Sequence, residues 1–372
     1  MAIVSRLKVD NFRNLQNVDL ELNPRFNIFF GDNGSGKTSL LEAIHVLSVG
    51  KSFRTTKVEP LLADTATEFF LYSELDTGDR IGLQRASSSN PTLRLNTNPQ
   101  SSWKEVATLL PVQVINSDVF LLVDGGASVR RRFLDWALFH VEHSYLICWR
   151  NYRKLIQQRN ALLKQSPTDL LSQLKVWDSE LSKVGEEIHR HRKALVSEYV
   201  PFLMSTLCEF FPGTLKGLEI QYKKGWLPGV DFTQALNESK GKDIKYRVTA
   251  CGPHRADLLI TSKGRPIAEM FSRGQIKLVA CALKISMSKY MEHKKLCKGN
   301  QSYSTVFLID DLASELDQTS CAFVLRALKE NKDQCIFTSI SQEAFSFLAE
   351  LTGTSSKFHV EHGKIYANKP AV

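Results

Sequence analysis

Residues 26–38 read Phe-Asn-Ile-Phe-Phe-Gly-Asp-Asn-Gly-Ser-Gly-Lys-Thr, an apolar run that passes directly into a glycine-rich turn. The apolar part has the length and character of a buried strand. After the turn, the apolar residues of 40–47 recur at helical spacing, which predicts a helix over 37–47. A strand, a glycine loop and a helix in this order are the context that a phosphate-binding loop requires.

The turn matches the P-loop pattern Gly-x4-Gly-Lys-Thr in full. Its glycines allow backbone N–H groups to point at phosphate oxygens without steric conflict. Lys37 would bring a cation to the β- and γ-phosphates of ATP, and the Thr38 hydroxyl would ligate Mg²⁺. A glycine turn without a ligand is the alternative, and the flanking strand and helix argue against it. We expect nucleotide contacts from Gly31, Asp32, Asn33, Gly34, Ser35, Gly36, Lys37, Thr38 and Ser39.

A pair of carboxylates follows a second apolar run. Thr305–Ile309 is predicted to be a buried strand, and it ends directly at Asp310 and Asp311. A carboxylate at the end of a strand beside the P-loop strand can hold the Mg²⁺ shell, which we assign to Asp310. Asp311 is then placed to orient or deprotonate the attacking water as a catalytic residue, together with Lys37. Two aspartates after a strand are also common loop starts, but the P-loop favours the catalytic interpretation.

Composition narrows the class of protein. The chain has 372 residues, 43% hydrophobic and 23% charged, as in a globular protein of two or three domains. Its formal net charge of +9 favours a polyanionic partner such as nucleic acid. Without a long apolar run, we expect a cytoplasmic protein with no membrane partner. The seven cysteines lack Cys-x-x-Cys spacing, which favours reduced, mostly buried thiols over disulfides or a zinc site.

A helical segment is predicted to interrupt an α/β domain. Short alternating runs over 68–96 predict an antiparallel sub-sheet, whereas residues 130–165 and 170–210 have helical patterns that suggest an antiparallel hairpin. In the second helix, a heptad pattern typical of helix–helix packing places apolar residues at 174, 177, 181, 184, 188 and 195.

Strand character returns near residue 245 and continues to the end of the chain. We therefore expect one ATP-binding α/β domain with a mixed sheet, formed by residues 1–114 and 245–372. The expected insertion is a mainly helical domain of residues 115–244.

Three further short motifs indicate the class of nucleotide-binding protein to which the P-loop belongs. Ser272-Arg273-Gly274-Gln275 precede a predicted helix, Ser314-Glu315-Leu316-Asp317 follow the aspartates, and Gln113 ends a predicted strand. They resemble the signature motif, D-loop and Q-loop of ABC-type ATPases. The resemblance implies an ABC-type head that pairs head to tail with a second head, so that the signature residues of one close over ATP held by the other. The N–H groups at a helix N-terminus are suited to binding the γ-phosphate of that ATP. It also implies nucleotide contacts from Ser272, Gly274, Gln275 and Gln113, and a metal contact from Gln113.

Longer blocks resemble one family in this superfamily, the RecF family of SMC/Rad50-like ATPases. They extend over nearly the whole chain, at residues 11–15, 51–55, 125–126 with 130–135, 158–163 and 252–258. The resemblance adds Arg13 to the expected nucleotide contacts. It implies an ATP-dependent, DNA-binding recombination mediator that forms a homodimer with ATP and Mg²⁺ on gapped or junction DNA, including its single-stranded part. It also implies cooperation with RecO and RecR in loading RecA during DNA repair, replication restart and the SOS response to DNA damage.

Other interpretations remain. An SMC/Rad50-like ATPase acting with a nuclease partner is the main alternative, but the stretch between Thr38 and Asp310 is too short for the long coiled coil of such proteins. A transporter ATPase would lack the helical arm. A small-molecule kinase would have no use for the motifs at 272–275 and 314–317, and a DNA-binding protein with a relic ATP site would bind DNA independently of nucleotide.

The chain departs from the ABC-type pattern in three places. Asp311 stands where most such ATPases have glutamate, and its shorter side chain predicts slow hydrolysis, with ATP acting as a switch. Thr338 and Ser339 stand where transporters have a switch histidine, as in the RecF pattern. Ala256 occupies a position where we expect an acidic residue.

DNA contacts are expected from basic side chains that pair with phosphates. The densest basic runs are Arg130–Arg132, His189–Lys193, Lys223–Lys224 and Lys240–Arg247. Each run could instead be a solvated helix face, and Arg130–Arg132 could be ion-paired. No base-reading motif is apparent, so we expect recognition of shape and backbone.

Overall fold

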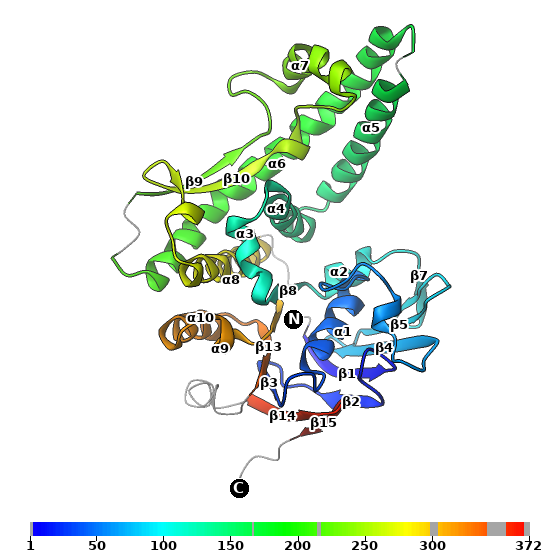
Figure 1. Cartoon of the computed structure of the whole chain (residues 1–372), viewed down its shortest axis with the longest axis vertical. Coiled ribbons are helices and arrows are strands. Elements are labelled where there is room, and N and C mark those ends of the chain that lie inside the picture. Colours follow the sequence, from blue (N-terminus) through cyan, green and yellow to red (C-terminus); the bar gives the residue numbers. More distant parts are fainter. Residues whose placement is uncertain (1–2, 166, 214–216, 298–303, 341–354, 368–372) are drawn as a thin grey trace. The chain divides into compact units, whose positions relative to one another are not determined.

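The computed structural model describes residues 3–165, 167–213, 217–297, 304–340 and 355–367, and the chain divides into two compact units (Figure 1). Met1–Val119 with Cys281–Val372 form one unit, which we call the head. Phe120–Ala280 form the other, which we call the arm. The expected insertion, residues 115–244, begins close to this boundary but ends earlier. The difference arises because strand β10, which follows residue 245, pairs with β9, which precedes it.

The P-loop strand lies inside a six-stranded sheet of the head. The strand order is β15-β14-β3-β13-β12-β8, and all neighbours are parallel except β14 and β15. Every residue of β12 and β13 is buried, which explains their continuous apolar runs. Their bounds are β3 (Phe26–Phe30), β8 (Val112–Ile115), β12 (Val306–Ile309), β13 (Gln334–Ser339), β14 (Ser355–Glu361) and β15 (Lys364–Ala367).

One expectation about this sheet needs correction. The strand that ends at Asp310 is not beside the P-loop strand, because β13 pairs with both β12 and β3. The carboxyl ends of all three strands still lie at one edge, since they run parallel. The carboxyl end of the intervening strand therefore enters the site, and its penultimate residue, Thr338, contacts Asp310.

A second, antiparallel sheet of the head confirms the sub-sheet expected over 68–96. Its order is β2-β1-β4-β5-β6-β7, and buried residues alternate along β4 as on a half-buried strand. Its strands are β1 (Val4–Asp10), β2 (Val18–Glu21), β4 (Glu68–Leu75), β5 (Arg80–Ala86), β6 (Thr92–Leu95) and β7 (Asn98–Gln100).

Helix α1 (Lys37–Val49) joins the two sheets into one core. Its apolar residues share a buried cluster with residues of β1, β4 and β5 on one side and of β12, β13 and β14 on the other. This burial fixes the helix that begins at the P-loop. The remaining helices of the head are α2 (Lys104–Leu109), α9 (Leu312–Glu315) and α10 (Gln318–Glu330), with short 3-10 turns η1 (Glu59–Leu61) and η2 (Ser117–Phe120).

The arm is a helical unit with a small sheet. A 41-residue helix, α6 (Leu170–Phe210), packs against α5 (Tyr145–Gln165). The sheet has the order β11-β10-β9. The other elements are α3 (Leu121–Asp124), α4 (Ala127–Val141), β9 (Leu218–Lys223), α7 (Phe232–Tyr246), η3 (Pro253–Arg255), β10 (Asp257–Ser262), β11 (Arg265–Pro266), η4 (Ile267–Glu269) and α8 (Arg273–Cys297), which continues into the head.

The buried stripe of α6 differs in part from the expected heptad. Leu174, Leu181, Ile188 and Leu195 are buried as expected, but Trp177 and Val184 are only half-buried. The alternate positions are taken one residue later, by Asp178, Gly185, Arg192 and Tyr199. A pattern of apolar residues misses this register because two of these side chains are charged and become buried through ion pairs.

Candidate nucleotide-binding site

The P-loop backbone adopts a conformation that requires glycine. Gly36 has φ of 119°, and a Cβ there would lie 3.0 Å from the side chain of Leu15. At Gly31, a Cβ would lie 2.1 Å from the carbonyl oxygen of Val360 in β14. The loop is therefore held closely between the first turn of the chain and β14, and its N–H groups can surround an anion.

Lys37 is buried at the start of α1, with its ammonium inside the loop. Its Nζ donates to the carbonyl oxygens of Gly31 and Asp32, both at 2.7 Å. Burial lowers the pKa of Lys37, and the carboxylates of Asp311 and Asp310 oppose that shift. The nearby carboxylates thus favour the charged form of Lys37. A charged ammonium in the loop can bind phosphate oxygens.

Hydroxyl groups from two elements meet the carboxylate of Asp310. Thr38 Oγ1 donates to Oδ1 at 3.0 Å, and Thr338 Oγ1 donates to the same oxygen at 2.6 Å. Adjacent ligands of an octahedral Mg²⁺ lie roughly 2.9 Å apart, given bonds of about 2.0–2.1 Å. The separation of the Thr38 hydroxyl and the Asp310 carboxylate therefore fits two ligands of one such ion.

Asp311 occupies a strained backbone conformation next to this cluster. Its φ and ψ are 49° and 48°, a left-handed region that residues other than glycine rarely adopt. Its N–H donates to Thr338 Oγ1 at 3.0 Å, and its carboxylate accepts from Ser314 Oγ at 2.6 Å. Strain of this kind is typical of functional sites. It presents the Asp311 carboxylate to the pocket, which it lines with Asp310.

Arg13 is also brought to the P-loop helix. Its guanidinium forms a two-pronged ion pair with Glu42 of α1, at 2.8 and 2.9 Å, and Glu42 is fully buried. Ser52 also donates to Glu42, and Arg54 lies 3.7 Å from its carboxylate. Glu42 therefore orients two basic side chains that line the pocket. Glu42 could not be singled out from the sequence, because a glutamate on a helix belongs to no motif.

Most of the P-loop, together with Arg13, Arg54, Asp310, Asp311 and Thr338, lines one pocket of about 1260 Å³. The turn between β14 and β15 lines it as well, and the N–H of Gly363 donates to the carbonyl oxygen of Ser35 at 2.8 Å. Of the expected nucleotide contacts, Gly31, Asp32 and Ser35 belong to the loop but do not line the pocket. The lining includes Arg13, Asn33, Gly34, Gly36, Lys37, Thr38, Ser39, Arg54, Asp310, Asp311, Thr338, His362, Gly363 and Lys364.

Gln113 lies inside its strand, whereas the sequence predicted it at the strand's end. It stands at the second position of β8, opposite Phe307, whereas Asp310 follows the end of β12. Its amide oxygen accepts from Lys284 of α8 at 3.0 Å, and it is not among the described residues that line the pocket. The nucleotide and metal contacts expected of Gln113 stay a prediction.

The signature motif begins α8 in the arm with a reciprocal cap. The N–H of Ser272 donates to the Gln275 side chain at 2.9 Å, and the N–H of Gln275 donates to Ser272 Oγ at 3.3 Å. This capping box explains why the helix begins here. Residues 272–275 are exposed, and a Cβ at Gly274 would meet no described atom within 4 Å. The helix N-terminus is thus open to a partner of the chain.

In two of the four basic runs, some side chains are held by structural contacts, whereas Arg132, Arg190 and Lys193 are exposed. In the first run, Arg130 forms an ion pair with Asp257 at 2.7 Å, and Arg131 donates to the carbonyl oxygen of Ala256. Ala256, where an acidic residue was expected, is fully buried, and the carboxylate that pairs with Arg130 comes from the next residue, Asp257. In the second run, Arg192 is buried and pairs with Asp135 at 2.8 Å.

The other two runs differ from each other. Lys224 donates to the carbonyl oxygen of Val230 and lies over the ring of Trp226. At the end of α7, by contrast, Lys242, Lys245 and Arg247 are exposed. The last run therefore offers the most accessible cations.

No helix in the described part of the chain is both long and apolar enough to span a bilayer.

Comparison with known proteins places this site in a family. The model of the RecF/RecN/SMC N terminal domain matches residues 3–362. The protein described as DNA replication and repair protein RecF in Cellvibrio japonicus (strain Ueda107) is 39% identical over 368 residues, covering 97% of this chain and 98% of that relative. RecF of Actinobacillus pleuropneumoniae serotype 3 (strain JL03) is 36% identical over 366 residues, covering 97% of this chain and 99% of that relative.

Solved structures agree. A structure of the recombination mediator protein RecF-ATP in the RecFOR pathway superposes with a TM-score of 0.83 at 25% identity, covering 99% of this chain and 98% of the other. An SMC head bound to the C-winged helix domain of ScpA has a TM-score of 0.58 at 15% identity over 99% of this chain and 98% of the other, and it shares the fold. The α/β ATPase fold and the family expected from the sequence are thus confirmed, and the chain belongs to the RecF family, within the wider RecF/RecN/SMC group.

Proposed function

We propose that this chain acts in DNA replication and repair as an ATP-gated DNA-binding protein of RecF type. The observation that carries the proposal is the P-loop cluster, in which Thr38 and Thr338 converge on Asp310 beside the buried Lys37. Nucleotide binding would control the pairing of two chains, and pairing would control the hold on DNA. This cycle takes place in the cytoplasm.

In the nucleotide cycle, Lys37 would turn from the carbonyl oxygens of its own loop to the β- and γ-phosphates. Thr38 and Asp310 would hold Mg²⁺, which neutralises phosphate charge when bound. Thr338 would keep the Asp310 carboxylate in position through its hydroxyl.

Hydrolysis is proposed to be slow, because the candidate for orienting water is Asp311. Its side chain is one methylene shorter than glutamate, and it already accepts a hydrogen bond from Ser314. The protein would then use ATP as a switch rather than as fuel. A steady-state turnover comparable to that of a transporter ATPase would overturn this part of the proposal.

In the proposed pairing, residues 272–275 at the start of α8 in one chain close over ATP bound by the other chain. This proposal is supported by the exposure of those residues. Ser272→Arg would place a bulky cation at the N-terminus of α8, so it is expected to spare ATP binding and to block pairing. Lys37→Ala is expected to abolish both ATP binding and ATP-dependent pairing. The measurement is the mass of the protein by light scattering with ATP. If Ser272→Arg forms dimers normally, residues 272–275 do not close over the partner's ATP.

For DNA, the structure favours the basic run at the end of α7. Exposed Lys242, Lys245 and Arg247 can pair with phosphates, whereas Arg130 and Arg192 are held by carboxylates. Replacing those three residues by glutamine is expected to weaken binding and to reduce the salt dependence of the affinity. Lys175→Gln, at an exposed position of α6 that lies outside all four basic runs, is the matched control.

The main experiment measures binding to gapped duplex DNA with ATP, ADP or no nucleotide at two salt concentrations, with the mass followed by light scattering. Dimer formation and tighter, salt-sensitive binding with ATP alone are expected. If neither mass nor affinity responds to ATP, the gating proposal fails.

Partnership with RecR and RecO, and through them RecA, is proposed on the same basis and is tested by co-purification with RecR in the presence of DNA. A co-purifying nuclease that requires ATP would favour the alternative SMC/Rad50-like role.

A further inference from the structure

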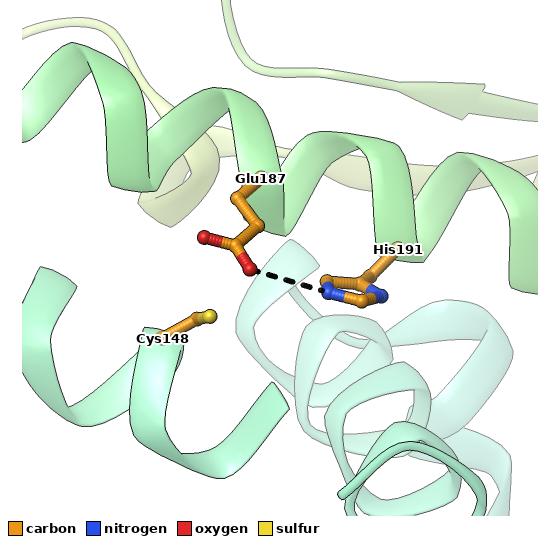
Figure 2. A group of neighbouring side chains, drawn as sticks. All are labelled: Cys148, Glu187 and His191. Atoms are coloured by element: carbon orange, nitrogen blue, oxygen red, sulfur yellow. Dashed lines mark ion pairs between the residues drawn. The ribbon is translucent and has the colours of Figure 1, made fainter. Parts of the chain in front are cut away.

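The arm carries a cluster of three side chains that the nucleotide mechanism does not use. Cys148 lies in the first turn of α5, and Glu187 and His191 lie one turn apart on α6 (Figure 2). The Cys148 thiol, one carboxylate oxygen of Glu187 and one ring nitrogen of His191 all lie within 4.8 Å of one another. In Figure 2 the Glu187 carboxylate points toward both the thiol and the imidazole.

This donor set suits a borderline-soft dication. Zn²⁺ binds sulfur, imidazole nitrogen and carboxylate oxygen at about 2.0–2.3 Å, which places ligands roughly 3.3–3.8 Å apart in a tetrahedron. The three donor atoms lie at most 4.8 Å apart in the structure, so side-chain movements of the order of 1 Å would bring them to the ligand spacing of Zn²⁺. A thiolate, a carboxylate and a neutral imidazole would also balance the charge of the ion.

Within the described part of the chain, a bound metal would replace only weak contacts among these three side chains. The Glu187–His191 ion pair is long, at 3.8 Å. The ring of His191 packs edge-on against Tyr145, which holds it on this side of α6. Burial, and then hydrogen bonding to Glu187, raises the pKa of the Cys148 thiol to about 11, so the thiol is protonated without a metal.

We propose that Cys148, Glu187 and His191 form a Zn²⁺ site with water as the fourth ligand. Solvent reaches the site, because the side chains of Glu187 and His191 are 37% and 23% exposed. Binding would deprotonate Cys148 and release one proton, so affinity would rise with pH. Because the ligands come from both helices, the ion would hold α5 against α6 and stabilise the arm.

The test uses full-length, reduced, metal-free and nucleotide-free protein titrated with Co²⁺ as a spectroscopic probe and then with Zn²⁺. One equivalent of Co²⁺ is expected to produce a thiolate-to-cobalt charge-transfer band, which Zn²⁺ then removes. Zn²⁺ alone is expected to raise the midpoint of thermal unfolding by several degrees. No band and no thermal shift in the wild-type protein would overturn the proposal.

Variants assign the site. Cys148→Ser should lose the band, and His191→Ala, at a partly exposed position, should weaken binding at least tenfold. The matched control is Cys297→Ser, because exposed Cys297 lies 3.6 Å from His293 with the same one-turn spacing on α8. Exposed Cys208→Ser is a second control. Both controls should keep the band. A band that survives Cys148→Ser, or disappears with either control, would place the metal at surface thiols and contradict the proposal.

Discussion

Replacing Arg159 by methionine is expected to lower the free energy of unfolding of the arm by about 3–5 kcal/mol. Arg159 is fully buried on α5, with Nε 2.6 Å from Asp178 of α6 and Nη1 2.7 Å from Asp243 of α7. Methionine would fill much of the volume but leave both carboxylates buried without a cation. The cost arises mainly from that uncompensated charge, because removing one partner of a buried pair costs more than the pair contributes.

The assay is urea and thermal unfolding followed by circular dichroism. A loss of 3–5 kcal/mol corresponds to a decrease in the unfolding midpoint of roughly 6–20 °C for a unit of this size. Adding Asp178→Asn to Arg159→Met should restore part of the stability, since Asp178 Oδ1 contacts Arg159. Lys154→Ala, at an exposed position of the same helix, should change stability by less than about 0.5 kcal/mol. If Arg159→Met were as stable as the control, the buried cation would not hold these helices together.

Three further predictions concern the head. Thr338→Val removes the hydroxyl that contacts Asp310, so the affinity for ATP with Mg²⁺ should fall about tenfold or more, whereas Thr338→Ser should retain it; equal affinities for valine and serine would contradict this. Burial raises the pKa of Asp333 from 3.8 to about 6, so its neutral form is favoured in the folded state and stability should fall by up to about 3 kcal/mol as the pH rises from about 4 through 6. Asp333→Asn should flatten that part of the stability curve, and an unchanged slope in unfolding measurements across this range would assign it to other groups. Gly363→Ala would place a Cβ 1.9 Å from the carbonyl oxygen of Asn14, so it should displace the β14–β15 turn and weaken ATP binding in a titration, whereas Gly78→Ala, at a positive φ in open space, should not.

The local features of the nucleotide site could be predicted because they depend on residues close in sequence. The glycines of residues 31–36, Lys37 and Thr38 form their loop with contacts mostly among themselves and their flanking elements. The capping box of Ser272 and Gln275 is likewise a four-residue pattern. Apolar runs of β12 and β13 identified strands, since each is buried along its whole length.

The strand order and the burial of charged side chains could not be predicted, because both depend on contacts between residues far apart in sequence. Nothing in the sequence places β13 between β3 and β12, and that order brings Thr338 to Asp310. In the arm, Asp178 and Arg192 interrupt an apolar heptad and are buried only because their partners come from other helices.

Cys148, Glu187 and His191 show the same limit, since their spacing along the chain resembles no metal motif and helix packing alone brings the three donors together. Patterns of residues close in sequence thus identified the family and its P-loop. The tertiary fold determined which distant side chains meet, because burial of a charge or convergence of ligands is a property of packed elements and not of either element alone.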